Sequence, residues 1–402
     1  MSTDFLHGVE VLTVEDGLRP IQTTRASVIG VIGTAADADP AKFPLNTPVL
    51  IAGKRSEAAA LDTTGDRMGT LPDALDAIFD QAGACVVVVR VAEGTSESQT
   101  MANIVGGVDA HTGAYKGVHA FLSAESTLGV TPRIHCAPGF TGVRPEDTIV
   151  PGQHLANPVV AEMLGIADRL RAVIIADGPD TTDADAIAWA KDFGSKRVYV
   201  VDPGVKVMDS DGNIVLQPAS ARAAGIIAKS DAERGFWWSP SNREVYGIVG
   251  TTRSVDFALG DPNARANLLN EKNVATIIRQ DGFRLWGNRT LSSDKKWAFL
   301  SVVRTADMIN DSLLRAHLWA VDRNITKNYI GDVVASVNAY LAHLKSIGAI
   351  IGGACWADKE LNTPEVIEAG QTYFDFDFTP PAPNERVTFR SRMTNGYYEE
   401  VL

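Results

Sequence analysis

One carboxylate, Asp177, stands where α/β enzymes often hold a catalytic group. It directly follows the apolar run Ala172–Ala176, and ligands of open α/β sheets bind outside the carboxyl ends of the strands. The next residues, Gly178, Pro179 and Asp180, are turn formers. An ordinary turn explains the pattern at least as well, because these residue types suit turns for backbone reasons alone. An enzyme with a site near Asp177 is therefore kept as the lesser alternative.

Other patterns that would carry chemistry are missing from the sequence. It contains no G-x-x-x-x-G-K-[ST], H-E-x-x-H, G-x-S-x-G or C-x-x-C. Gly30 and Gly33 do not complete G-x-G-x-x-G, so close packing explains them better than a phosphate site. His135 lies within an apolar strand-like run and is interpreted as a core or edge residue. His317 and His343 lie on predicted helices and have no Cys or carboxylate at metal-ligand spacing. We therefore expect no catalytic residue, no cofactor and no metal.

Composition narrows the class of protein further. The 402 residues carry a net charge of −12, which argues against a general nucleic-acid binder. Three cysteines, Cys85, Cys136 and Cys355, lie far apart, which is typical of a reducing compartment. The N-terminus does not resemble a signal peptide, and no apolar run reaches the length of a membrane span. We expect folding in the cytoplasm, no nucleic-acid partner and no membrane insertion.

The fold class predicted from hydrophobic periodicity is α/β. Unbroken apolar runs alternate with amphipathic helical patterns at 71–79, 159–170 and 183–193. Such runs indicate strands buried on both faces, hence a largely parallel, helix-covered sheet. The strand-like runs are Ser27–Ile32, Pro48–Ala52, Cys85–Val91, Arg133–Ala137, Ala172–Ala176 and Arg197–Val201.

Two domains are predicted. The first spans 25–255, with a possible insertion at 94–130 where Gly, Ser and Thr become frequent. The second, a smaller α/β domain, spans 256–384. It begins with strands near 274–279 and 297–303, and a long helical pattern from Asp307 to about Leu344 follows them. The aromatic pair Trp237-Trp238 is predicted to pack in the core or between the domains.

Three cations punctuate the predicted long helix. Arg323 and Lys327 are four residues apart, and Arg315 lies eight before Arg323. On one continuous helix they would share a broad face that could dock on an acidic partner. A solvated helix face is the simpler interpretation.

Extended arms flank the two domains. In the N-terminal arm, 1–24, the strand-like residues are Val9, Val11 and Val14. In the C-terminal arm, 385–402, Val387, Phe389 and Met393 alternate with polar residues, and a stiff Pro380–Pro383 spacer precedes them. A strand gains little alone in water but much on the edge of another sheet. The residues leave two options open: the arms pair with neighbouring subunits, or they fold back on their own chain.

Several segments together resemble the contractile-tail sheath family, in particular the sheath of P2-like myophages. No segment is a catalytic signature, but their order and spacing are specific, and the likeness covers nearly the whole chain. The segments are Leu268–Ile278, Gly282–Thr290, Val303–Ile309, Gly348–Cys355 and Asn362-Thr363, with Pro132–Gly139, Val200–Pro203, Pro218–Ser220 and Ser239–Asn242 upstream.

The resemblance implies a structural protein that polymerises as a helical sheath around a tail tube and contracts without nucleotide hydrolysis. It implies that the first domain lies outward, that the second faces the tube, and that both arms pair with strands of neighbouring subunits. The implied partners are further copies, arranged in six-fold rings, the tail tube protein, and the baseplate and tail terminator proteins. The implied location is the virion tail, assembled in the host bacterial cytoplasm. A sheath of a phage-derived bacteriocin or secretion machine shares this mechanism and stays open.

Overall fold

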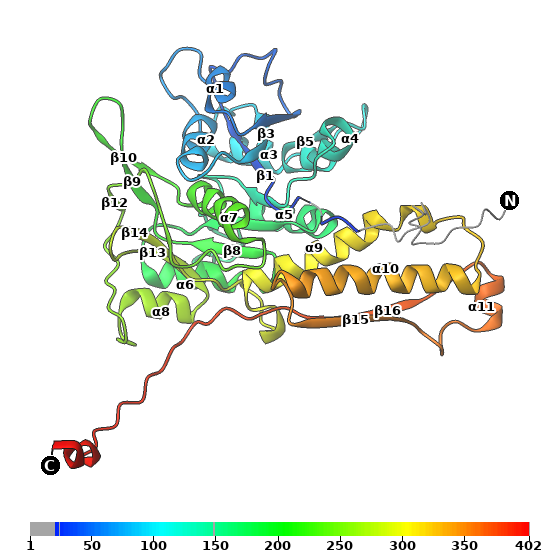
Figure 1. Cartoon of the computed structure of the whole chain (residues 1–402). Coiled ribbons are helices and arrows are strands. Elements are labelled where there is room, and N and C mark those ends of the chain that lie inside the picture. Colours follow the sequence, from blue (N-terminus) through cyan, green and yellow to red (C-terminus); the bar gives the residue numbers. More distant parts are fainter. Residues whose placement is uncertain (1–20, 24, 148, 402) are drawn as a thin grey trace, which may run out of the picture.

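The computed structural model describes residues 21–23, 25–147 and 149–401, and one nine-stranded sheet forms its centre (Figure 1). Its strands are β1 (Ile29–Thr34), β2 (Pro48–Ala52), β3 (Cys85–Val91), β6 (Ile134–Cys136), β7 (Val173–Asp177), β8 (Val198–Val201), β11 (Arg243–Glu244), β13 (Val274–Arg279) and β14 (Phe283–Trp286). Their order is β11-β14-β13-β8-β7-β6-β1-β3-β2. The strands from β13 to β3 run parallel, and antiparallel strands lie at both edges. The predicted α/β class and largely parallel sheet are confirmed.

Strand β3 explains why the sheet needs helices on both faces. Val86 and Val88 point into the core on one face, and Val87 and Val89 point into the core on the other. All four are fully buried, because successive side chains of a strand alternate between its faces. An apolar run of this kind is stable only between two helical layers.

The two helical layers are distinct. On one face α2 (Leu71–Phe79) packs beside α7 (Ser220–Arg234). The opposite face is covered by α3 (Glu97–Val105), α5 (Pro158–Leu170), α6 (Asp183–Lys191) and α8 (Arg265–Glu271). The start of helix α5 is fixed by local residues. The Asn157 side chain accepts hydrogen bonds from the N–H groups of Val159 and Val160, and Pro158 occupies the first turn.

The small elements occupy the periphery. Residues 94–130 form α3, β4 (Gly107–Val108), β5 (Tyr115–Lys116), η2 (Gly117–Ser123) and α4 (Ala124–Leu128). Phe121 and Ile104 from this segment are buried in the core on the α5 face. A separate sheet contains β9 (Val205–Met208), β10 (Ile214–Gln217) and β12 (Gly250–Thr251). Short helices α1 (Arg55–Ala58) and η1 (Ala59–Leu61) follow β2.

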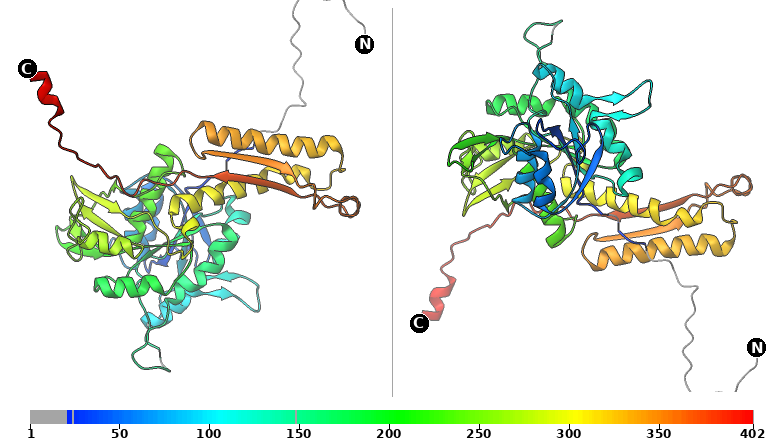
Figure 2. Two further views of the ribbon diagram at one scale, coloured as in Figure 1. Left: turned by 90° about the horizontal axis from the view of Figure 1, so that it is seen from below. Right: turned by 90° about the horizontal axis from the view of Figure 1, so that it is seen from above.

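A second unit extends sideways from the large sheet (Figures 1 and 2). It contains α9 (Leu300–Ala316), η4 (Leu318–Ala320), α10 (Lys327–Ser346), β15 (Gly352–Ala357), α11 (Pro364–Glu368) and β16 (Phe374–Thr379). Strands β15 and β16 form a two-stranded antiparallel sheet that lies against the helices. Its core includes Val337, Leu341 and Leu344, which lie in the long helical pattern predicted from the sequence.

Two strands predicted for the second domain differ from the structure. The predicted strand at 274–279 forms, but as β13 it pairs with β8 in the large sheet, so that sheet continues past residue 255. The predicted strand at 297–303 is wrong, because this segment is the short helix η3 (Lys295–Trp297) followed by the start of α9. Leu300, Val303 and Ala306 are all buried and recur every three residues, which suits a helix face.

The long helix predicted from Asp307 to about Leu344 is two helices. A connection at 317–326 separates α9 from α10. Asp322 adopts a left-handed backbone with φ of 61°, which an α-helix cannot contain. The Thr326 side chain then accepts a hydrogen bond from the N–H of Tyr329 and starts α10.

Two further expectations can be compared with the structure. Trp237 packs against the core of the second unit, as predicted. For Trp238 the prediction is wrong, because its side chain is half-exposed and lies beside Arg234. No helix in the described part of the chain is both long and apolar enough to cross a membrane.

Candidate functional site

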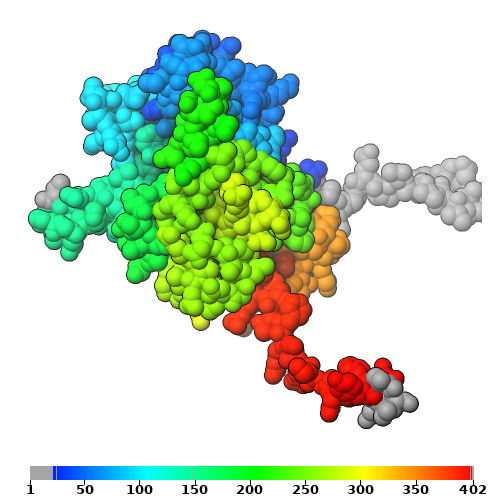
Figure 3. All heavy atoms as spheres, turned by 90° about the vertical axis from the view of Figure 1, so that its left-hand side faces the viewer, coloured from blue at the N-terminus to red at the C-terminus, as the bar shows by residue number. Residues whose placement is uncertain are grey.

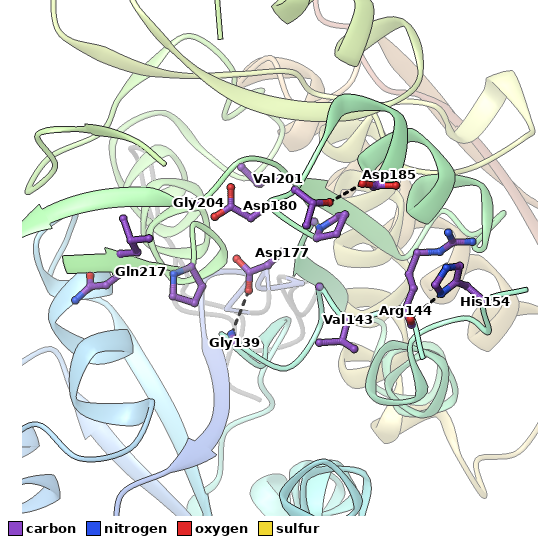
Figure 4. A pocket seen from close by; sticks show the side chains of 16 residues that line it. Gly139, Val143, Arg144, His154, Asp177, Asp180, Asp185, Val201, Gly204 and Gln217 are labelled. Atoms are coloured by element: carbon purple, nitrogen blue, oxygen red, sulfur yellow. Dashed lines mark hydrogen bonds between the residues drawn. The ribbon is translucent and has the colours of Figure 1, made fainter. Parts of the chain in front are cut away.

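Asp177 ends β7 and is buried among hydrogen-bond donors. One carboxylate oxygen accepts from the backbone N–H of Ser220 at 2.7 Å, and the other accepts from the Ser220 hydroxyl at 2.7 Å. The Thr141 hydroxyl approaches the second oxygen at 3.3 Å. The Gly139 N–H approaches it at 3.5 Å (Figure 4). Burial raises the pKa of Asp177 to about 6, and these hydrogen bonds oppose the rise. The carboxylate fastens the start of α7 to the end of β7.

A cavity of about 600 Å³ opens beside this carboxylate at the carboxyl ends of the parallel strands. Arg144, His154, Asp180 and Gln217 also line it (Figure 4). Arg144 is held by Asp192 at 2.6 and 2.9 Å, and His154 contacts the Arg144 carbonyl oxygen at 3.1 Å. Within the described ranges, no group of three or more His, Cys, Asp or Glu side chains could hold a metal ion.

The hydrogen bonds predict that Asp177→Ala destabilises the fold. Loss of the carboxylate leaves the buried N–H and hydroxyl of Ser220 without a hydrogen-bond acceptor. We therefore expect the free energy of unfolding to fall by about 2–4 kcal/mol. Urea denaturation followed by circular dichroism measures the change. The exposed Asp211→Ala in the β9–β10 turn is the matched control and should change stability by less than about 0.5 kcal/mol. Equal stability of the two variants would contradict the structural role of Asp177.

The histidines singled out in the sequence have packing roles or lie at the surface. His135 is completely buried and stacks on Phe121 with ring centroids 4.7 Å apart. Burial lowers its pKa to about 3. The His317 ring contacts the Leu313 carbonyl oxygen and the Ser336 hydroxyl, which ties α9 to α10. His343 is exposed.

The predicted row of cations is broken up by the two-helix structure. Arg315 lies in the last turn of α9, Arg323 lies in the connection, and Lys327 begins α10. The prediction that they share one helix face is therefore wrong. Arg315 is already paired, at 3.0 Å with Glu125 and 3.1 Å with Asp311. The Arg323 guanidinium lies over the Trp319 ring, 5.2 Å from its centroid.

Helix α9 carries a set of buried ion pairs that sequence reasoning missed. Arg304 donates to both carboxylate oxygens of Asp231 on α7, at 2.7 and 2.5 Å. Both side chains are only 5% exposed. These contacts fasten α9 to α7, which covers one face of the large sheet.

Two more pairs join α9 to the amino-terminal ends of the central strands. Arg133, just before β6, reaches Asp311 at 2.5 Å. Arg197, just before β8, pairs with Asp307, and burial raises the pKa of Asp307 although Arg197 opposes that rise. The spacing of the two acidic residues was a sequence signal for these ion pairs, because Asp307 and Asp311 are four residues apart and therefore lie on one helix face.

The C-terminal arm leaves the body of the molecule and contacts it at its base (Figure 3). Glu385 accepts two hydrogen bonds from the Arg289 guanidinium, at 2.7 and 2.6 Å. Beyond this point Val387, Phe389 and Met393 are 62%, 93% and 101% exposed. No strand is assigned to the arm in the described residues, which end in the short helix η5 (Gly396–Val401). Fold-back of this arm on its own sheet is therefore not observed.

The sheet that could receive an arm is the pair β15–β16. It has only two strands among the described residues, so each strand has one unpaired edge. Phe374, Phe376 and Phe378 face the helices but are only partly buried. The N-terminal candidates Val9, Val11 and Val14 lie outside the described residues.

Family models match most of the chain. The tail sheath protein central domain matches residues 134–291, and the phage tail sheath C-terminal domain matches residues 292–394. The tail sheath protein Gp18 domain III N-terminal region matches residues 27–91.

Solved structures share the fold. The helical sheath of the anti-feeding prophage in its contracted state aligns with a TM-score of 0.71 at 19% identity, over 96% of this chain and 99% of that one. The sheath of an extracellular contractile injection system, PVC, aligns with a TM-score of 0.66 at 18% identity, over 98% of this chain and 99% of that one.

Curated relatives are similar from end to end. A prophage major tail sheath protein of Pseudomonas aeruginosa (strain UCBPP-PA14) is 45% identical over 99% of both chains. The tail sheath protein of Escherichia phage P2 is 38% identical over 100% of this chain and 98% of its own. With this identity over its full length, the chain belongs to the phage tail sheath protein family.

Proposed function

We propose that this protein polymerises into a helical, contractile sheath around a tail tube, with the terminal arms linking each copy to its neighbours. The observation that carries the proposal is the combination of an exposed, alternating C-terminal arm with a two-stranded sheet that has unpaired edges. An arm that joins the sheet of the next copy makes a head-to-tail contact. Such contacts give an open helix when rotation is combined with an axial rise.

The energetics favour an arm that binds another copy. Burying each of Val387, Phe389 and Met393 contributes roughly 1.5–3 kcal/mol, and the backbone of the arm gains a ladder of hydrogen bonds. Negative-stain electron microscopy of the overexpressed protein tests the function. Long hollow cylinders are the expected result, and a strictly monomeric protein under all conditions would overturn the proposal.

Contraction in this proposal moves each subunit as one body. The buried pairs Arg304–Asp231, Arg133–Asp311 and Arg197–Asp307 oppose hinge motion between α9 and the large sheet. During contraction the arms then bend, because they make few contacts with the rest of the subunit. The energy of contraction is stored in the extended lattice, and no catalysis is involved. The hydrogen bonds that occupy the carboxylate of Asp177 support this view.

The partners in this proposal are further copies in six-fold rings, the tube protein, and the baseplate and terminator proteins, assembled in the host cytoplasm. Relatives include a helical sheath and a baseplate complex of the anti-feeding prophage. A complete phage and a phage-derived injection device would use the chain in the same way. Capsid and terminase genes beside its gene would identify a phage.

For the tube-facing surface we retain Arg315, Arg323 and Lys327, with the latter two as the principal contacts because Arg315 is paired within the chain. Arg323→Glu combined with Lys327→Glu should weaken co-assembly with purified tube by about tenfold, or about 1.4 kcal/mol. Polymerisation without tube should persist. Co-sedimentation with tube measures the loss.

The matched control for this test reverses Lys42 and Lys54, two exposed lysines of the first domain. The control should bind tube normally. Unchanged tube binding by the Arg323 and Lys327 variant would remove these residues from the tube surface.

A further inference from the structure

The C-terminal arm holds the one asparagine of the chain that a glycine follows, Asn395 before Gly396. Every other asparagine precedes a residue that has a side chain. Asn395 and Gly396 are both exposed, and they lie where η5 begins, on a segment that projects away from the body of the molecule (Figures 1 and 2). The dipeptide is therefore accessible to water.

Local contacts fix the backbone at this point. The Gly396 N–H donates to the Thr394 hydroxyl at 3.1 Å, and the Asn395 carbonyl oxygen accepts from the Tyr398 N–H at 3.0 Å. A Cβ atom built at Gly396 would meet the Thr394 hydroxyl oxygen at 3.4 Å and no other described atom within 4 Å. Because both hydrogen bonds come from within the arm, the backbone here can change conformation without disturbing the core.

This dipeptide has a reactivity that the other asparagines lack. The side-chain carbonyl carbon of an asparagine lies within reach of the next backbone nitrogen, and a bond between the two closes a succinimide ring. A side chain on the following residue obstructs that approach and restricts the backbone, whereas glycine does neither. We propose that Asn395 is a self-modification site, at which the free subunit converts its own asparagine into isoaspartate and aspartate.

The reaction needs only water. The Gly396 nitrogen gives up its proton and bonds to Cγ of Asn395, the bond from Cγ to Nδ2 breaks, and the amide group leaves with that proton as ammonia. Water then opens the succinimide at one of its carbonyl carbons. Opening at the main-chain carbonyl carbon leaves the chain connected through Cγ, as isoaspartate, and opening at Cγ gives aspartate. The net change is the consumption of water and the release of ammonia.

The product alters the arm in two ways. Isoaspartate adds an atom to the main chain, so the side chains before and after it no longer alternate in one register. A new carboxylate also appears in an arm whose three arginines are balanced by three glutamates.

The modified position lies inside the exposed apolar part of the arm and not beyond it. Tyr397 and Tyr398, which follow it, are 72% and 74% exposed. A subunit modified at Asn395 therefore joins a sheath less readily than a fresh one. This consequence rests on the proposed function, whereas the modification itself does not.

Two comparisons isolate the reactivity of the dipeptide. Asn384 precedes the same arm and is also exposed, but Glu385 follows it. Gly396→Ala keeps Asn395 and adds only a methyl group, which would contact the Thr394 hydroxyl. Both comparisons retain an exposed asparagine and remove the glycine after it.

Peptide mapping by mass spectrometry tests the site in the full-length protein, stored for several days at neutral pH. The peptide that contains Asn395 should accumulate isoaspartate and aspartate at least about tenfold faster than Asn384 does, and at least about tenfold faster than in Gly396→Ala. The rate should rise with pH, because the attacking nitrogen must lose its proton. An Asn395 that stays unmodified, or equal conversion in Gly396→Ala, would rule out the self-modification.

Sheath formation from the stored protein tests the consequence. Isoaspartate at position 395 should be at least about twofold scarcer in the sedimented sheath than in the supernatant. Stored Gly396→Ala should form as much sheath as its own fresh sample. Equal isoaspartate in the sediment and the supernatant would contradict the effect on assembly.

These results are distinguishable from failure of the proposed function. Fresh protein that forms no sheath would contradict the proposed function and, with it, the effect on assembly. Peptide mapping of the free subunit decides the modification site in either case.

Discussion

Removing residues 385–402 is expected to leave a folded monomer that forms no sheath. The deleted arm carries Val387, Phe389 and Met393, whose side chains are largely exposed in the single chain. Their removal therefore takes nothing from the hydrophobic core of the subunit. Each contributes roughly 1.5–3 kcal/mol when it is buried on a neighbour, so deletion removes several kcal/mol from every link of the lattice. Electron microscopy and sedimentation measure the loss, which should exceed a hundredfold in polymer.

The fold of the truncated chain should be nearly unchanged. Among the described residues, the contact that the truncation removes from the body of the subunit is the pair Arg289–Glu385, whose side chains are 40% and 37% exposed. Exposed pairs of this kind contribute less than about 1 kcal/mol. A control variant, Arg289→Met in the full-length chain, separates loss of this pair from loss of the arm. Normal tubular polymers from the truncation would refute the arm role.

Breaking the ion pair between Arg304 and Asp231 should have the largest effect on stability. Arg304→Met leaves the carboxylate of Asp231 buried without its partner, and we expect a loss of about 3–5 kcal/mol in the free energy of unfolding. Arg304 also donates to the Ala26 carbonyl oxygen at 3.1 Å, so the variant loosens the segment before β1 as well. Urea denaturation measures the change.

The matched control is Arg55→Met. Arg55 pairs with Asp80 at 2.6 Å, but its side chain is 55% exposed, and we expect less than about 1 kcal/mol. If the Arg304 variant is as stable as the Arg55 variant, the buried pairs do not hold α9 to the large sheet. The argument for a subunit that moves as one body would then lose its support.

The large sheet was readable from the sequence because its strands are buried on both faces. A run such as Cys85–Val91 has one physical interpretation, and β3 confirms it. The segment 297–303 misled because β-branched Val302 and Val303 resemble a strand. The helical spacing of its buried residues becomes clear only when the segment is read together with Ala306 and Ile309, which are also buried.

The assembly surface was only partly predictable. Alternation in 385–402 pointed to a strand that needs a partner, and the exposure of Phe389 agrees with that need. The break between α9 and α10 was not predicted, because the left-handed backbone at Asp322 leaves no strong signal in the residue type. The hydrogen bond from the Cys355 N–H to the Asn338 side chain, which joins β15 to α10, was not predictable either, because the two residues are 17 positions apart and meet only in the folded chain.

The most direct test of the arm-linked lattice is a helical reconstruction of the polymer by electron cryomicroscopy at side-chain resolution. The account predicts that the C-terminal arm of another copy forms a strand beside the β15–β16 sheet. Continuous density that joins each arm to the sheet of its own copy, in an assembled cylinder, would contradict it.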